Sequence, residues 1–532
     1  MIQNVWPLLD AAGMRALDRY TIEDQGVPGQ LLMESAGRAL VEVVLARRSA
    51  GATSAVLCGL GNNAGDGLVA ARHLHQLGVP VRAVFVYDPA RLVGDAAANF
   101  ERARAVGVPI ETGTWSVVEG EIWIDALFGT GLDRPVEGEA ARAIERLNRR
   151  PPTSLVIAAD LPSGLSADTG QILGCSVRAD ATVTFGLPKL GLALPPGRGL
   201  AGRITVARIG VADSAPGWVP AAELWTQAAA AAHLPERFAF GHKGHFGHVL
   251  VIAGSEGKTG AAALSALGAQ RAGAGLVTVA CPASLNEILE GLCMEAMTAP
   301  VAETKARTLA AGAEVALLAL AQERDVVALG PGIGRDSETG ELVRSLALQI
   351  EKPLVIDADA LYALAGGHAA LQARRAPTIL TPHPGEAARL LSVATSDINR
   401  DRLTAARRLA EESGAVVVLK GAGSVIAAPG ERTVVNSTGG PLLASGGSGD
   451  VLTGMVAALL AQGLAARAAA VLAVFLHGWA ADRLAARSTD FGSLASEVAR
   501  EVPLAAEALR EKACETRDAL QRAGLLLAFP EP

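Results

Sequence analysis

The chain has 532 residues, which is too long for one ordinary core and predicts two or three domains. Half of the residues are hydrophobic, only 4% are aromatic, and the net charge of −7 gives no reason to expect nucleic acid as a partner. The longest apolar stretch, residues 455–476, is interrupted by Gln462 and Arg467. It therefore predicts a pair of buried helices and no association with a membrane.

Two further features bear on the compartment. The first residues lack the basic start and apolar run of a signal peptide, which favours the cytoplasm. The five cysteines are scattered and form no CxxC pair, which is typical of reduced, structural thiols. Lysine is rare, with seven residues against forty arginines, so a lysine beside a glycine motif is more notable here than usual.

Short apolar runs separated by helical patterns recur through the first half of the chain. They lie at residues 54–58, 81–87, 121–127, 154–160, 181–185 and 203–209. Strands of this kind alternating with helices predict a parallel sheet covered on both faces. Before the first run, residues 10–47 predict two helices interrupted at Gly26-Val27-Pro28-Gly29.

The strand rhythm stops between residues 211 and 240, where three prolines and no strand pattern predict a linker at 216–236. It resumes at 248–253, 276–280, 325–329, 353–357, 378–380 and 416–419, followed by a hairpin-like pair at 424–428 and 432–436. The prediction is an α/β protein with two three-layer αβα domains, at 1–215 and 237–515, and a C-terminal tail at 516–532.

Polar residues follow three of the first-half strands. The loop Gly59-Leu60-Gly61-Asn62-Asn63-Ala64-Gly65-Asp66-Gly67 opens a helix, while Asp125 and Asp160 end later strands beside glycine loops. Such loops let backbone amides approach an anion, although a tight turn with a helix cap explains each one alone. Because ligands of open parallel sheets bind beyond the carboxyl ends of the strands, the three ends together favour a site.

These motifs resemble the epimerase domain of the bifunctional NAD(P)H-hydrate repair enzymes, from about residue 9 to residue 211. The resemblance also rests on Leu32-Met33-Glu34-Ser35-Ala36-Gly37, Asp160-Leu161-Pro162-Ser163-Gly164 and Pro188-Lys189-Leu190-Gly191-Leu192. It implies a Rossmann-like sheet, and a potassium ion near Asn63, Asp125 and Ser163. It also implies that the hydrate is bound by Asn62, Asn63, Ala64, Gly65, Asp66, Gly129, Thr130, Gly131, Leu132, Asp133, Arg134, Pro135 and Asp160.

The implied reaction inverts C6 of the nicotinamide ring, which requires loss and re-addition of water or ring opening. Either route needs a general acid or base, and Asp160 is the candidate, with Asp125 as the cation ligand. Family loops often carry glycine where this chain has Ala64. The extra methyl lies beside the anion loop, and we expect it to be tolerated.

The most specific motif of the second half is Ser445-Gly446-Gly447-Ser448-Gly449-Asp450. Small residues opening a helix expose several amides to one place, which predicts an anion hole for a transferred phosphoryl group. Asp450 lies where its carboxylate can accept a hydroxyl proton. An ordinary charge at a helix N-terminus is the alternative, and the density of glycines around Asp450 argues against it. The spacing differs from that of a Walker loop.

Three other segments fit a nucleotide site, each with a plainer alternative. Lys420 ends a strand where its ammonium can meet phosphates, unless it is a surface lysine. The loop Gly330-Pro331-Gly332-Ile333-Gly334 either lets the backbone approach a substrate closely or is shaped for packing. His383-Pro384-Gly385-Glu386 can grip a substrate ring or phosphate, although a capped helix start explains Glu386 equally well.

This half resembles the ribokinase-like family, in particular its NAD(P)H-hydrate dehydratase branch, from about residue 237 to residue 513. The branch-specific motifs include Arg271-Ala272-Gly273-Ala274-Gly275, Asp357-Ala358-Asp359-Ala360-Leu361 and Thr381-Pro382-His383-Pro384-Gly385-Glu386. The resemblance implies hydrate contacts from Gly332, Gly334, His383, Pro384, Gly385, Glu386, Ala387, Ala388, Arg389 and Asp450. It implies nucleotide binding by Lys420, Gly421, Ala422, Gly423, Ser424, Gly440, Pro441, Leu442, Leu443, Ala444, Ser445, Gly446, Gly447, Ser448 and Gly449.

Together the resemblances imply metabolite repair. The first domain would epimerise the R and S forms of NADHX and NADPHX, the hydrates of NADH and NADPH. The second would dehydrate the S form at the expense of ADP, or of ATP, through a phosphorylated intermediate. Asp450 would act as the base, and Mg²⁺ would accompany the nucleotide. The family also implies a homo-oligomer of four or more copies.

Three alternatives remain open from the sequence. A vitamin or sugar kinase with an accessory domain shares the Gly-Gly-Ser-Gly-Asp loop. The N-terminal half can also be a non-catalytic binding module, although Asp125, Asp160 and the intact Asn-Asn loop argue against loss of the site. An NAD dehydrogenase is disfavoured because the dinucleotide fingerprint is missing. His242, His245 and His248 are separated by glycines and lack a carboxylate or thiolate partner, so we expect no zinc site.

Overall fold

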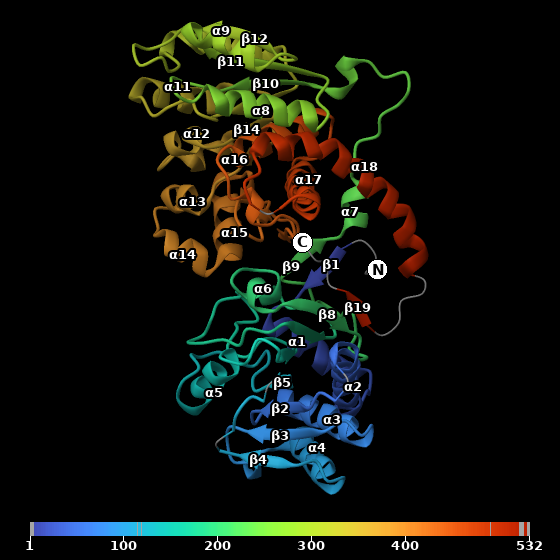
Figure 1. Cartoon of the computed structure of the whole chain (residues 1–532). Coiled ribbons are helices and arrows are strands. Elements are labelled where there is room, and N and C mark those ends of the chain that lie inside the picture. The colour runs from blue at the N-terminus through green and yellow to red at the C-terminus, as the bar shows by residue number, and fades with distance from the viewer. Residues whose placement is uncertain are drawn as a thin grey trace. The chain divides into compact units, whose positions relative to one another are not determined.

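The structure is a computed structural model that describes residues 5–49, 51–113, 115–118, 120–489, 491–520 and 526–528. The chain forms two compact units (Figure 1). The first contains Trp6–Glu223 and the strand near the C-terminus, and the second contains Leu224–Asp518. Both combine parallel strands with helices, which confirms the predicted α/β class.

The first unit has eight strands in one sheet, in the order β19-β8-β7-β6-β5-β2-β3-β4, among the described residues. These strands are β2 (Ser54–Cys58), β3 (Val81–Phe85), β4 (Ile110–Thr112), β5 (Ile122–Ala126), β6 (Leu155–Ala159), β7 (Ala181–Phe185), β8 (Arg203–Ala207) and β19 (Leu526–Ala528). The helices are α1 (Ala11–Arg19), α2 (Gly29–Arg47), α3 (Asn62–Gln76), α4 (Gly94–Ala105), α5 (Gly138–Asn148) and α6 (Gly197–Leu200).

Alternation along β2 explains the layers of this unit. Val56 and Cys58 pack with α2 and α3 in one hydrophobic cluster, whereas Ala55 and Leu57 pack with α5 in a second one. Because successive strand residues point to opposite faces, the sheet is buried on both sides. The chain order reverses between β2 and its neighbour β5, and this reversal is where an open parallel sheet binds its ligand.

The other sheet of the described chain has eleven strands in the order β1-β9-β18-β17-β16-β15-β14-β13-β10-β11-β12, of which β10 to β18 belong to the second unit. The strands are β1 (Val5–Leu8), β9 (Ala222–Trp225), β10 (His248–Ile252), β11 (Leu276–Pro282), β12 (Met297–Val301), β13 (Val326–Leu329), β14 (Leu354–Ile356), β15 (Thr378–Leu380), β16 (Val416–Leu419), β17 (Val425–Ala427) and β18 (Val434–Val435). Strands β10 to β16 are parallel, and β17 and β18 form the predicted antiparallel pair. The order reverses between β10 and β13.

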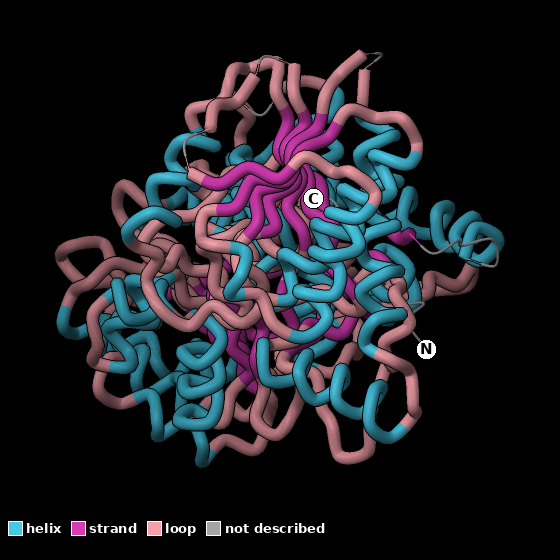
Figure 2. The backbone as a smooth tube through the Cα atoms, turned by 90° about the horizontal axis from the view of Figure 1, so that it is seen from below, coloured by secondary structure: helices cyan, strands magenta, loops and turns pink. Residues whose placement is uncertain are grey.

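Figure 2 shows the helices of the chain in cyan beside its strands in magenta, and the second unit contributes many of these helices. Those of the second unit are α7 (Gln227–Ala232), α8 (Thr259–Arg271), α9 (Asn286–Leu292), α10 (Glu314–Gln322), α11 (Ser337–Gln349), α12 (Asp359–Ala363), α13 (Pro384–Leu391), α14 (Thr395–Arg400), α15 (Arg402–Ser413), α16 (Ser448–Ala461), α17 (Ala466–Arg487) and α18 (Ala495–Leu520). The predicted buried helix pair is α16 and α17, which share one core cluster. Helix α17 is long and apolar enough to cross a membrane, but 72% of its most apolar window is buried inside the protein.

Two glycines fix the position of helix α16, which carries Asp450. A Cβ on Gly454 would lie 1.9 Å from the Ser265 carbonyl oxygen, and one on Gly268 would lie 2.2 Å from that of Val451. Both distances are far below van der Waals contact, so α16 and α8 cross with their backbones touching. The start of α16 is thereby held against the carboxyl ends of the strands.

The prediction that residues 211–240 contain no strand is wrong. Ala222–Trp225 forms β9 and is followed by helix α7, which begins behind the Thr226 side-chain cap. Leu224 and Trp225 are buried, and β9 lies beside β18 in the sheet. Four residues carry too little alternation to reveal a strand that is stabilised by a partner over 200 residues away. Likewise, Leu526–Ala528 in the predicted tail pairs antiparallel with β8.

Candidate functional sites at the ends of the parallel strands

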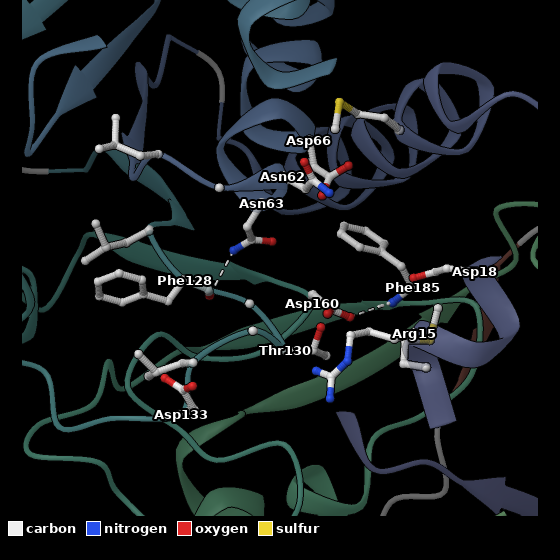
Figure 3. Close-up of a pocket in the computed structure, with 18 of the residues that line it drawn as sticks. Arg15, Asp18, Asn62, Asn63, Asp66, Phe128, Thr130, Asp133, Asp160 and Phe185 are labelled. Carbon is white, nitrogen blue, oxygen red and sulfur yellow. Dashed lines mark hydrogen bonds between the residues drawn. The ribbon is translucent and has the colours of Figure 1, made fainter. Parts of the chain in front are cut away.

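A cavity of about 1000 Å³ lies at the β2–β5 reversal of the first unit (Figure 3). Its walls come from the loops after β2 and β5, from Asp160 after β6, and from helices α1 and α2. Of the predicted substrate-binding residues, those that line it are Asn62, Asn63, Asp66, Gly129, Thr130, Gly131, Leu132, Asp133, Arg134, Pro135 and Asp160. The structure therefore brings the three predicted segments to one place.

Ala64 and Gly65 lie differently. The Ala64 side chain is fully buried in the hydrophobic cluster between α2, α3 and the sheet. A Cβ on Gly65 would meet the Met33 sulfur at 2.6 Å. Their side-chain positions thus face the core rather than the cavity, and the methyl of Ala64 does not narrow the anion loop.

Asp160 is held by a fully buried lysine. Lys189 Nζ donates to Asp160 Oδ1 at 2.5 Å and to the Phe185 carbonyl oxygen at 2.6 Å. The Phe185 N–H and the Thr184 hydroxyl donate to the same Oδ1 at 3.1 and 3.2 Å. Asp160 also has a φ of +65°, a conformation that costs a non-glycine residue about 1 kcal/mol or more. Oδ1 is thus fixed, while the side chain lines the cavity.

Asp125 ends β5 and is fully buried. Its carboxylate accepts hydrogen bonds from the Ser163 N–H at 2.8 Å and the Ser163 hydroxyl at 2.6 Å. Burial raises the pKa of Asp125 to about 6 despite these bonds. Beside it, Asn63 Nδ2 donates to the Phe128 carbonyl oxygen at 2.9 Å, and the Phe128 N–H donates to the Ser163 hydroxyl. The three residues predicted to surround potassium therefore lie together in one oxygen-rich cluster.

Two further carboxyl groups face the same cavity. Asp18 on α1 and Asp66 on α3 line it, and no hydrogen bond to either carboxyl group is present in the described structure. Burial raises the pKa of Asp18 to about 6. Burial, followed by the nearby Asp160 charge, raises the pKa of Asp66 well above its usual range. Asp18 and Lys189 were not predicted as site residues, although Lys189 belongs to a quoted motif and lysine is rare in this chain.

The second site is organised around Asp357, a buried residue that follows β14. Lys420 Nζ, at the end of β16, donates to Asp357 Oδ1 at 2.7 Å, and the Thr453 hydroxyl on α16 donates to Oδ2 at 2.6 Å. A Cβ on Gly449 would lie 3.3 Å from Lys420 Nζ. Lys420 is therefore not a surface lysine, because it lies directly beside the anion loop. Burial is the largest single influence on the pKa of Lys420 and lowers it. The charges of Asp357, Glu386 and Asp450 and the hydrogen bond to Asp357 together outweigh burial, so the pKa is raised.

Asp450 is the third residue of α16 and is half-buried. Burial and the neighbouring Asp357 charge raise its pKa to about 7, while Lys420 opposes the shift. Glu386 behaves in the same way, with its pKa raised to about 7 chiefly by burial. A carboxyl group that changes protonation near neutral pH is suited to accept a proton during catalysis.

His383 and Glu386 form a capping box at the start of α13. His383 Nδ1 accepts from the Gly385 and Glu386 N–H groups, and Glu386 Oε2 accepts from the His383 N–H at 2.8 Å. The capped-helix explanation therefore holds for Glu386, whose pKa also marks it as a site group. Ala387 and Ala388 are buried, so only Arg389 among the last three predicted residues is exposed.

The Gly330–Gly334 loop lies at the β10–β13 reversal. The Ser255 hydroxyl donates to the Gly332 carbonyl oxygen at 2.7 Å, and the Gly254 N–H donates to that of Pro331. The Gly334 N–H donates to Asp359, which also accepts from Lys258 at 2.7 Å and Arg335 at 2.9 Å. Burial would raise the pKa of Asp359, but these two cations lower it. Asp357, Asp359, Lys258, Arg335 and Thr453 were not predicted as site residues.

The remaining predicted nucleotide residues surround the N-terminus of α16. Gly447 precedes the helix with a φ of +88°, and Gly446 is exposed with no atom within 4 Å of a would-be Cβ. The Gly439 N–H donates to Asp482 on α17 at 2.8 Å, which anchors the segment that leads into the loop. Leu442 is buried in the core, whereas Gly421 and Ala422 are exposed. Among the described residues, no group of three or more His, Cys, Asp or Glu side chains could hold a metal ion.

A chain with two α/β units, each with a cluster of carboxyl groups around a lysine at the ends of its parallel strands, is a two-site α/β enzyme. The family model described as NAD(P)H-hydrate dehydratase matches residues 249–504. The one described as YjeF-related protein N-terminus matches residues 29–191. The chain belongs to the family of bifunctional NAD(P)H-hydrate repair enzymes, because close relatives of that name match it nearly end to end.

Two relatives show the extent of the match. The bifunctional NAD(P)H-hydrate repair enzyme Nnr of Moorella thermoacetica is 40% identical over 522 residues, which cover 95% of this chain and 97% of the relative. That of Thermofilum pendens is 40% identical over 506 residues, with 94% and 96% covered. A solved structure, an ADP/ATP-dependent NAD(P)H-hydrate dehydratase from Bacillus subtilis co-crystallized with ATP/Mg2+, is 31% identical and covers 54% of this chain and 98% of its own, with a TM-score of 0.46. The family resemblance predicted from the motifs is confirmed.

Proposed function

We propose that the first unit epimerises the R and S forms of NAD(P)H-hydrate, and that the second unit dehydrates the S form through a phosphorylated intermediate, with ADP or ATP as donor. Family membership supports both halves. The observation that carries the proposal is the position of Asp450, whose carboxyl group lies at the start of α16 among Lys420, Asp357 and the glycine loop. This position supports the assignment of Asp450 as the base, of Lys420 as the cation and of the glycine loop as the anion hole.

For the dehydratase, Asp450 removes the proton of the C6 hydroxyl as that oxygen attacks the terminal phosphorus of the nucleotide. The amides of the glycine loop and Lys420 stabilise the transferred phosphoryl group. Hydroxide is a poor leaving group and phosphate is a good one. The C6–O bond of the phosphorylated hydrate then breaks, C5 loses a proton, and the ring double bond of NAD(P)H is restored. Mg²⁺ enters with the nucleotide phosphates and water.

For the epimerase, the cavity of about 1000 Å³ is the proposed hydrate site, with Asp160 as an acid–base group at C6. The Asp160→Asn variant is expected to lose R/S interconversion. Potassium suits the Asn63, Asp125 and Ser163 cluster because Asp125 is a fully buried carboxylate that forms no salt bridge within the described chain. A buried charge without a counter-ion is costly, and a hard cation bound to these oxygens would offset it.

The resemblance also implies a homo-oligomer of four or more copies, and NADHX and NADPHX as substrates, and both stay proposals. The cytoplasmic location and the domain limits at 215 and 237, which rest on the sequence pattern, stay proposals as well.

The test is to incubate mixed R and S NADHX with the full chain and ADP, ATP or no nucleotide. We expect complete conversion of both epimers to NADH, followed by the absorbance of the reduced ring, only when a suitable nucleotide is present. If only the S form were converted, the result would support the dehydratase activity and refute the epimerase activity. Consumption of hydroxymethylpyrimidine or a sugar in place of the hydrate would favour the kinase alternative.

A further inference from the structure

Three carboxyl groups share one lysine in the cavity of the first unit. Asp18, Asp66 and Asp160 come from α1, α3 and the end of β6, and all three line the cavity with Lys189. If all four groups were ionised, the cluster would carry a formal charge of −2 within one cavity. Like charges close together favour the uptake of a proton by one of the carboxyl groups. The arrangement therefore favours a mixed state in which some carboxyl groups are ionised and others are protonated.

The hydrogen bonds decide which carboxyl group remains ionised. Asp160 Oδ1 accepts from the Lys189 ammonium, from the Phe185 N–H and from the Thr184 hydroxyl. Charge-assisted bonds of this kind stabilise a carboxylate. Lys189 is fully buried, and its bonds to Phe185 and Thr184 hold it in place. Asp66 receives no hydrogen bond within the described structure, so its ionised form lacks the bonds that stabilise Asp160 and gains only from the Lys189 charge.

Asp66 and Asp160 approach the cavity from different elements, as Figure 3 shows. Asp66 projects from helix α3 and Asp160 from the strand end below it in that view. A substrate ring between them would have one carboxyl group toward each face. Inversion at C6 by loss and re-addition of water needs such a pair, because one face must lose hydroxide and the other must gain it.

We propose that Asp66 and Asp160 are a complementary acid and base for the epimerisation, and that Lys189 is the positioning residue that keeps the negative charge on Asp160. This inference rests on the proposed epimerase activity. Asp66 donates its proton to the departing C6 hydroxyl, the C–O bond breaks with the help of the ring nitrogen lone pair, and water leaves. A water molecule then adds to the opposite face of C6 while Asp160 takes its proton. Solvent returns a proton from Asp160 to Asp66, and the reverse reaction exchanges the two roles.

The charged groups around the pair are part of the electrostatics. Besides Asp18 and Lys189, the charged side chains that line the cavity are Arg15, Arg91, Asp95, Asp133, Arg134 and Glu137. The raised pKa of Asp66 agrees with its role as a protonated acid. Activity that requires this proton should be retained below the raised pKa and lost as the pH rises above it. The raised pKa of Asp18 has the same cause but stays nearer the usual range.

The experiment follows the conversion of R-enriched NADHX toward the R/S mixture by chromatography, with the full chain and no nucleotide. We expect Asp66→Asn to lower kcat about a hundredfold or more, because a positioned general acid contributes that much, with KM within a few-fold. Asp18→Asn tests the other unbonded carboxyl group. Asp24→Asn is the matched control and is expected to stay near wild type, because Asp24 is exposed in the same unit and does not line the cavity. Retention of the wild-type kcat by Asp66→Asn would overturn the assignment. A hundredfold loss in Asp18→Asn without a loss in Asp66→Asn would assign the acid to Asp18 instead.

Lys189→Met tests the positioning role. Removal of the ammonium leaves Asp160 without its counter-ion, so we expect a lower kcat and an acidic limb of the pH profile that moves to higher pH. A merely structural lysine would lower kcat without moving that limb, and this result would reject the role of Lys189. Should Lys189→Met fail to fold, the Asp66 variants still decide the acid. A wild-type chain that leaves the R/S ratio unchanged refutes the epimerase and the pair together, whereas an active wild type with an active Asp66→Asn refutes only the pair.

Discussion

The lysines of the two sites are used differently although each is surrounded by three carboxyl groups. Lys189 is 0% exposed, and its ammonium is bonded to Asp160, Thr184 and a backbone carbonyl of the same unit. Lys420 is 18% exposed, is bonded to Asp357 and lies beside Gly449 of the anion loop. Lys189 thus positions and neutralises a carboxylate that lines the proposed substrate cavity. Lys420 is itself held by a buried carboxylate and remains available to a ligand anion.

A second contrast concerns the carboxyl groups that form no ion pair with a lysine. Asp450 and Glu386 have pKa values raised to about 7, so both titrate near neutral pH. Asp66 is raised well above its usual range. A base for hydroxyl attack must be ionised, whereas an acid for hydroxide departure must be protonated. Near neutral pH, Asp450 is therefore partly ionised and can act as a base, whereas the shift of Asp66 favours the protonated form that an acid requires.

The largest effect is expected from Asp450→Asn. Loss of the base should lower nucleotide-dependent dehydration about a thousandfold while R/S interconversion continues. In the wild type, dehydration should fall as pH decreases below about 7, because the raised pKa of Asp450 means that its carboxylate takes up a proton there. Recovery of reduced-ring absorbance measures the first reaction and chromatography of the epimers measures the second. Dehydration that survives in Asp450→Asn would place the base elsewhere.

Lys420→Met should have the next largest effect and sharpens the contrast between the lysines. The nucleotide loses a phosphate partner, and Asp357 loses its counter-ion, so we expect kcat/KM for the nucleotide to fall about a hundredfold, or about 3 kcal/mol. Because Lys420 lowers the pKa values of Asp450 and Glu386, the pH profile should also move to higher pH. Lys420→Arg keeps the charge and is the control. A pH profile that stays in place would show that Lys420 does not act on Asp450.

Much of this arrangement was predictable from local sequence. Asp125, Asp160 and Asp450 are all adjacent to strand ends or to a glycine loop, and such positions are recognisable without a structure. The lysine partners are different. Lys189 lies 29 residues after Asp160, and Lys420 lies 63 residues after Asp357. Their roles depend on which strands become neighbours in the sheet, and no local pattern encodes that order.

The same dependence on distant elements explains why the sequence did not reveal Asp18 as a site residue or β9 as a strand. Asp18 lies on a helix that precedes the first strand of its sheet, so nothing in its sequence context indicates a cavity formed by later loops. Glu386 shows the opposite limit, since its capping role was visible in the sequence. The raised pKa was not, because burial by distant elements causes it.

Potassium provides a smaller and purely physical test of the first site. If the cation binds near Asp125, it should raise the melting temperature of the first unit relative to an equal concentration of a bulky organic cation. Saturation at a hundred times the dissociation constant stabilises the bound state by about 2.7 kcal/mol. Asp125→Ala removes the carboxylate and should abolish the difference. An equal response of the wild type to both cations would show that no specific potassium site is present.

Ala64→Gly should have the smallest effect, and it separates the core side of helix α3 from its cavity side. Ala64 is fully buried against the sheet, whereas its neighbours Asn63 and Asp66 line the cavity. Removal of the methyl loses buried apolar surface and adds backbone freedom, which together cost about 1 to 2 kcal/mol. We therefore expect a melting temperature lower by about 2–6 °C with epimerase kcat and KM within twofold. A large fall in KM would mean instead that the methyl obstructs the substrate. In that case the methyl of Ala64 would weaken hydrate binding at the anion loop even though its side chain faces the hydrophobic core of the first unit.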